Sequence, residues 1–69
     1  MQLVVQERYG VREVKVGEHT WLPIGLVAGD VLEQLRHVAG VLREWSPDKP
    51  LLDAAVTAAE DGSLEIVRA

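Results

Sequence analysis

The clearest pattern of apolar and polar positions in the chain lies between Asp30 and Trp45. Glu33 follows Asp30 by three residues, which is the spacing of an N-terminal capping box. The pattern therefore predicts a core-facing helix over residues 30–45. Its apolar face is formed by side chains that recur at helical spacing: Val31, Leu35, Val38, Leu42 and Trp45.

Two apolar runs near the start of the chain have the spacing of β-strands. Residues 3–8 are rich in β-branched side chains, and Val11 to Val16 alternates valine with charged residues. Tyr9 and Gly10 stand between the runs, where a glycine favours a tight turn. The pattern predicts a β-hairpin. Because an isolated hairpin is only marginally stable in water, we expect its apolar face to pack on the helix.

The middle segment, residues 17–29, is apolar but interrupted by Pro23 and by three glycines. Residues 19–22 are predicted to form a third short strand that ends at Pro23, because proline cannot donate to a β-ladder. Residues 24–28 then either pack beneath the helix or lie on the surface for a partner. A strand followed by a buried connector is the favoured interpretation.

The last third of the chain predicts a second helix and a closing strand. Pro50 suits the first turn of that helix, Gly62 suits its C-terminal cap, and residues 64–67 form the strand. The order predicts a small two-layer α+β fold, a single domain over residues 1–69. An N-terminal hairpin, with or without a third strand, shares one sheet with the C-terminal strand, and both helices lie on one face. The predicted core comprises the apolar residues of these elements: Leu3, Val5, Val14, Val16, Val31, Leu35, Val38, Leu42, Leu52, Ala55, Leu64 and Ile66.

A chain of 69 residues can bury only a thin core. Small domains compensate with disulfides, a metal ion or a partner subunit. This sequence has no cysteine, which excludes disulfides and thiolate metal sites together. Association with another chain is the means of stabilisation that remains.

The net charge of −4 argues against binding to nucleic acid or to anionic lipid, because both require a clustered positive surface. No apolar run is long enough to span a membrane, and the N-terminus does not have the pattern of a signal peptide. We therefore expect a cytoplasmic protein. The absence of asparagine and the excess of arginine over lysine fit a GC-rich or thermophilic bacterial source.

No combination of residues in the sequence predicts catalysis, a cofactor or a metal site. The segment Gly25 to Gly29 resembles a phosphate-binding loop, but it lacks the lysine and hydroxyl residue of such loops, and Asp30 would repel phosphate. His19 and His37 each have a neighbouring glutamate and are explained as surface residues. The chain is therefore predicted not to be an enzyme.

The apolar residues of the middle segment exceed what a core of this size can hold. The sequence thus predicts a small protein-interaction or structural module that self-associates, as a homodimer, with another protein as a further kind of partner. Trp21 is expected at the centre of the contact, because tryptophan dominates interface hot spots. The predicted interface residues are Trp21, Leu22, Ile24, Leu26, Val27 and Val41.

The alternative function is that of an acidic regulatory protein associated with nucleic acid, of the antitoxin or winged-helix type. The segment Leu51–Val67 resembles the part of a winged-helix domain in which a helix runs into a terminal strand. In this interpretation Arg36 and Arg43, seven residues apart on one helix face, would meet phosphates. The net charge and the mixed charges around both arginines favour the interaction module instead.

Overall fold

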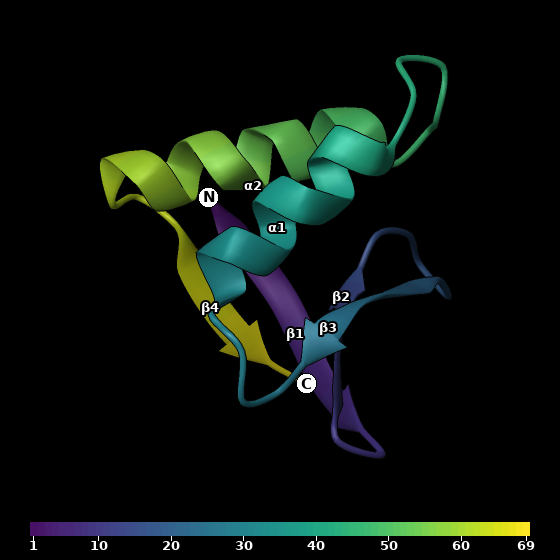
Figure 1. Ribbon diagram of the computed structural model, residues 1–69, viewed down its shortest axis with the longest axis vertical. Helices are drawn as coiled ribbons and strands as arrows, with labels where there is room; N and C mark the ends of the chain where they lie inside the picture. The colour runs from purple at the N-terminus through teal and green to yellow at the C-terminus, as the bar shows by residue number, and fades with distance from the viewer.

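A computed structural model describes all 69 residues, as a four-stranded sheet with two helices packed on one face (Figure 1). The α+β fold predicted from the sequence is confirmed. Neither helix is long and apolar enough to cross a membrane. The elements in chain order are β1 (Gln2–Arg8), β2 (Val11–Lys15), β3 (Trp21–Leu26), α1 (Val31–Val41), α2 (Lys49–Asp61) and β4 (Glu65–Arg68).

The strands lie in the order β3-β2-β1-β4, so that the first and last strands of the chain are neighbours. β1 pairs with β2 in antiparallel register, with Val5 opposite Val14. β4 pairs with β1 in parallel register, with Ile66 opposite Leu3. The sequence-based expectation that strands from both ends of the chain share one sheet is therefore confirmed.

The third strand is longer than the sequence predicts, because β3 continues through Pro23 to Leu26. Proline is tolerated there because β3 is an edge strand, and the missing N–H interrupts no ladder on the open side. The register between β2 and β3 shifts at Arg12 and Glu13. Ile24, which follows Pro23, is buried, so this part of the middle segment packs beneath the helices.

The core lies between the helices and the sheet. Six of the predicted core residues are fully buried, namely Leu3, Val5, Val14, Leu35, Leu52 and Ala55. Ile24, Ala39 and Ala58 complete the buried set. Five more predicted residues are half-buried and pack against it: Val16, Val31, Val38, Leu42 and Leu64.

Two sequence-based predictions about packing are wrong, and the first is the place of Trp45 on the core-facing side of the helix. Helix α1 ends at Val41 rather than at Trp45, because Leu42 adopts an extended conformation with φ −68° and ψ 140°. The connection to α2 projects away from the sheet, and Trp45 on it is 78% exposed (Figure 1). Instead of core contacts, Trp45 carries the guanidinium of Arg43 over its ring, 5.4 Å from the centroid.

The second error is Ile66, which is 40% exposed. Its position opposite Leu3 places it on the helix side of the sheet, as predicted. However, β4 is an edge strand, and the part of it around Ile66 lines an open cavity instead of packing beneath a helix. Alternation gave the correct side of the sheet but not the extent of the helical cover.

Candidate interaction surface

The sheet has one covered face and one open face. Side chains along a strand alternate between the two faces of a sheet. Leu3, Val5 and Val14 lie on the inner face, which the helices cover, and they are buried. The intervening positions make up the outer face, which no other part of the chain covers: Gln2, Val4, Gln6, Arg8, Val11, Glu13, Lys15, Trp21, Pro23, Leu26, Glu65 and Val67.

Apolar side chains of the outer face lie on all four strands. Trp21 pairs with Lys15, and Leu26 pairs with Val11, in the ladder between β2 and β3. On the other half of the sheet, Val4 pairs with Val67. These side chains belong neither to the buried core nor to the half-buried residues packed against it. Trp21 and its apolar neighbours thus have no partner from another layer of their own chain.

The polar centre of the outer face is already hydrogen-bonded. Gln6 donates from Nε2 to Oε1 of Glu13 at 2.8 Å, across β1 and β2. Gln2 likewise donates from Nε2 to Oε2 of Glu65 at 3.3 Å. Covering these pairs costs less than covering unpaired polar groups, because each retains a partner when water is removed. The polar centre therefore does not prevent the outer face from becoming an interface.

The charges of the outer face balance, although the chain as a whole carries a net charge of −4. Arg8 and Lys15 contribute two positive charges, and Glu13 and Glu65 contribute two negative charges. A second face of the same composition is therefore not repelled by net charge, and it offers a carboxylate for each cation.

The structure divides the predicted interface residues among different surfaces. Trp21 and Leu26 lie on the outer face. Leu22 packs against the core, and Ile24 is only 6% exposed, so the single chain already uses both. Ile24 was wrongly assigned to an interface, because it lies two residues after Leu22 on the inner face of β3 and is part of the core.

The two remaining predicted residues lie elsewhere. Val27 is half-buried in the turn after β3, where its N–H donates to the carbonyl oxygen of Gly10. Val41 is exposed at the C-terminus of α1, on the helix side of the sheet. The sequence reasoning missed Val4, Val11 and Val67 as outer-face residues. The available signal was their position next to predicted core residues, since adjacent residues of a strand point to opposite faces.

The basic pair of the alternative function is not assembled. Arg36 lies on α1 and its Nε is 3.9 Å from Oε1 of Glu60 on α2. Arg43 lies beyond the end of α1, over the ring of Trp45. The prediction that both arginines share one helix face is wrong, because α1 ends at Val41. The fold also has two helices rather than the three of a winged-helix arrangement.

The structure brings together no metal site, and no group of three histidine, aspartate or glutamate side chains could hold a metal ion. His19 and His37 are exposed and lie on different elements. Hydrogen bonds from the side chain and main chain of Ser63 lower the pKa of Asp61. This carboxylate accepts from the Ser63 N–H at 2.8 Å at the end of α2 and is explained by that turn.

Comparison with known proteins adds no further evidence on function. The chain matches no family model, no curated protein and no solved structure. The function is therefore inferred from the residues of the outer face and from the remaining surface of the molecule.

Proposed function

We propose that this chain is a small non-enzymatic interaction module that self-associates, two copies packing through their outer faces. One observation carries the proposal. Trp21 lies on an open sheet face together with apolar side chains from all four strands, and no other layer of the chain packs on them.

The size of the face fits the requirement of a stable dimer. Specific interfaces bury about 800 Å² on each partner, which is roughly a sixth of the 4583 Å² surface of this chain. The molecule measures 29 × 25 × 21 Å, so that covering one of its broad faces removes an area of this order. Burial of apolar surface contributes about 25 cal/mol per Å², and a buried tryptophan contributes more area than any other side chain of the face.

The charge of the outer face and the small size of the core support a second copy of this chain as the partner. The outer face carries two cations and two carboxylates, and a symmetric contact places the same apolar and charged groups on both sides. Only nine of the 69 residues are buried in the single chain. A second copy extends this thin core by adding a layer to the uncovered side of the sheet.

The test compares the two tryptophans, which occupy different surfaces. Trp21→Ala removes the largest apolar side chain of the outer face, and Trp45→Ala removes the same side chain from the exposed connection between α1 and α2. Sedimentation equilibrium across a dilution series is expected to give twice the 7.6 kDa chain mass for the wild type and for Trp45→Ala. Trp21→Ala should dissociate at protein concentrations at least tenfold higher, because loss of an interface hot spot costs about 2 kcal/mol or more. Circular dichroism establishes that both variants fold.

Two results would contradict the proposal. One is a wild type that stays monomeric at about 1 mM, where only about 4 kcal/mol of binding free energy would be needed for half-association. The other is a dimer that Trp21→Ala and Trp45→Ala leave equally intact. Salt-dependent binding of the wild type to duplex DNA, measured alongside, would instead support the nucleic-acid alternative.

A further inference from the structure

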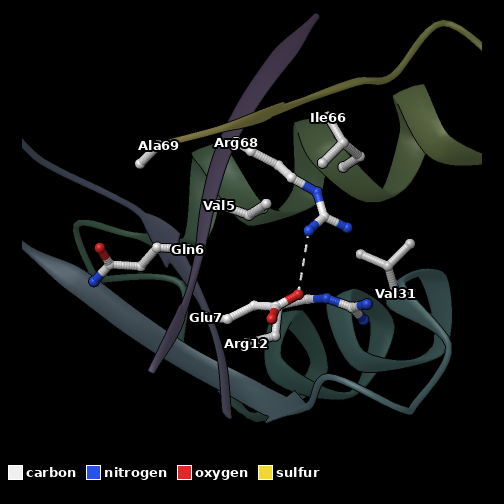
Figure 2. A pocket seen from close by; sticks show the side chains of 8 residues that line it. All are labelled: Val5, Gln6, Glu7, Arg12, Val31, Ile66, Arg68 and Ala69. Carbon is white, nitrogen blue, oxygen red and sulfur yellow. Dashed lines mark hydrogen bonds and ion pairs between the residues drawn. The ribbon is translucent and has the colours of Figure 1, made fainter. Parts of the chain in front are cut away.

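A cavity of about 520 Å³ opens on the inner face, on the side of the sheet opposite to the proposed interface. It lies where the carboxyl ends of β1 and β4 approach the first turn of α1 (Figure 2). Its volume is within the range of small-molecule sites. The lining combines apolar side chains, from Val5, Val31 and Ile66, with charged ones, from Glu7, Arg12 and Arg68.

Arg12 in the wall of this cavity is half-buried and forms no ion pair, although Glu7 lies opposite it in the ladder between β1 and β2. Its guanidinium donates to the carbonyl oxygens of Gly29 at 3.0 Å and Val27 at 3.2 Å, and to Oε1 of Gln34 at 2.8 Å. All three acceptors are neutral, and Arg12 forms none of the ion pairs of the molecule. Since a guanidinium has five N–H donors, two of them are not used by the protein.

The position of Arg12 is fixed before any ligand binds. Gln34 accepts from Arg12 through Oε1 and donates from Nε2 to the carbonyl oxygen of Leu26 at 2.7 Å. The arginine is thus connected at two points to the segment that joins β3 to α1 and at a third to α1 itself. A guanidinium held in this way loses little conformational entropy when it binds an anion.

Arg68 is a second cation in the same space. Figure 2 shows its guanidinium and that of Arg12 around the region that Val31 and Ile66 also border. Its partner is Glu7, with Nη1 and Oε1 3.3 Å apart, and the Arg68 side chain is 79% exposed. Exposed pairs of this kind contribute little to stability, so Arg68 can turn toward a ligand at small cost.

We infer that this cavity binds a monocarboxylate that carries a short apolar group. Two arginines against one glutamate leave one positive charge, which a single carboxylate neutralises. Guanidinium and carboxylate match in geometry, and the unused donors of Arg12 supply the hydrogen bonds. Val5, Val31 and Ile66 provide the contact for the apolar group. The Glu7 carboxylate disfavours dianions such as phosphate esters.

Two kinds of ligand carry a single carboxylate next to a short apolar group: a free carboxylic acid and the C-terminal residue of a peptide. The probes are sodium hexanoate, with hexanamide as its uncharged counterpart, and acetyl-alanyl-leucine, with its C-terminal amide as the counterpart. Binding is followed by backbone amide shifts of Val31 and Ile66 and by the side-chain N–H of Arg12. Both carboxylates, or one of them, should give saturable shifts at these positions, and the preferred probe identifies the kind of ligand.

Two variants and one control make the result specific. Arg68→Ala should weaken carboxylate binding about tenfold, the loss expected for one charge-assisted hydrogen bond. Ile66→Glu places a second carboxylate in the cavity and should abolish binding. Arg43→Ala removes a cation that lies outside the cavity, so this variant should bind the carboxylate probes as tightly as the wild type does.

The inference is overturned if neither carboxylate gives saturable shifts at the cavity residues. It is also overturned if the uncharged amides bind as tightly as the carboxylates, or if Ile66→Glu binds like the wild type. None of these measurements depends on the outer face, so the inference and the proposed self-association succeed or fail separately.

Discussion

The side-chain amide of Gln34 occupies the space in which a side chain on Gly25 would lie. A Cβ added to Gly25 would be 2.7 Å from Nε2 of Gln34, and one added to Gly29 would contact the same atom. The backbone of β3 and of the following turn therefore closes around this amide from two sides. Because Gln34 also holds Arg12, both glycines determine how the cavity wall is arranged.

Replacement of Gly29 by alanine should displace the Gln34 amide. The displacement breaks its bonds to Arg12 and to the Leu26 carbonyl, and we expect a loss of about 1–3 kcal/mol in the free energy of unfolding. Urea denaturation measures the change. A Gly29→Ala variant as stable as the wild type would show that Gln34 does not organise this segment.

Replacement of Gly40 by alanine should have the opposite effect. Gly40 is exposed on α1, and a Cβ added there meets nothing within 4 Å. Alanine in an exposed helix stabilises by about 0.5–1 kcal/mol relative to glycine. Urea denaturation should show this gain in the free energy of unfolding. Sedimentation equilibrium should give the same association constant as for the wild type. Weaker association of Gly40→Ala would place a partner on this helix surface and contradict the outer-face interface.

Leu35→Ala tests the core. Leu35 is completely buried at the centre of α1, and its truncation should cost about 2–5 kcal/mol. Thermal unfolding should therefore shift downward by about 8 °C or more. Val41→Ala, at an exposed position of the same helix, serves as the control and should change stability by less than about 0.5 kcal/mol. Equal effects of the two substitutions would contradict the orientation of α1.

The pKa of Asp61 provides a test at the end of α2. Hydrogen bonds from the Ser63 side chain and N–H hold it below its usual value of 3.8. The stabilisation from this turn is thus present above pH 3.8 and is lost as the pH falls through the lowered pKa of the folded state. Carboxyl NMR shifts against pH should show Ser63→Ala moving the pKa of Asp61 upward. An Asp61 carboxyl that titrates at 3.8 or above in the wild type would disagree with this geometry.

Local sequence patterns predicted the helices and strands and their order, because the residues that begin or end each of them are recognisable in the sequence. The capping residue Asp30 accepts from the N–H of Glu33 at 2.9 Å, as the capping-box spacing indicates. Gly62 ends α2 in the left-handed conformation at φ 81°, where glycine is favoured. Tyr9 and Gly10 form the turn between β1 and β2, both with positive φ. These features depend on neighbouring residues alone.

The parts that could not be predicted depend on distant contacts. Trp45 continues the periodicity of α1, but periodicity does not show that the connection to α2 projects away from the sheet. Ile66 alternates correctly, but alternation does not show where helical cover ends. The predicted third strand ended at Pro23, so alternation was not extended to Ile24, which lies two residues after Leu22 on the inner face of β3. For Trp45 and Ile66 the local pattern persists, but the tertiary contact that it implies is absent or reduced.

The residues of the candidate sites also fall into those that the sequence predicted and those that only the fold brings together. The sequence predicted Trp21 as an interface residue because a large aromatic side chain in an irregular apolar segment is unusual. Its companions Val4 and Val67 come from opposite ends of the chain and meet only through the parallel pairing of β1 with β4. The cavity was not predicted, because Arg12 and Arg68 appear in the sequence as ordinary charged residues of strands. Only the fold places both beside Val31.

The most direct test of the proposed self-association is the fluorescence of Trp21 in a Trp45→Phe variant, recorded across a dilution series. If two copies pack through their outer faces, the emission maximum lies at shorter wavelength in concentrated solution. It then moves to longer wavelength on dilution, over the range in which the mass falls to that of one chain. A Trp21→Phe variant, in which Trp45 is the only tryptophan, should emit at an unchanged long wavelength throughout. Emission from Trp21 that stays constant while the mass changes, or a mass that never exceeds that of one chain, would contradict the outer face as the interface.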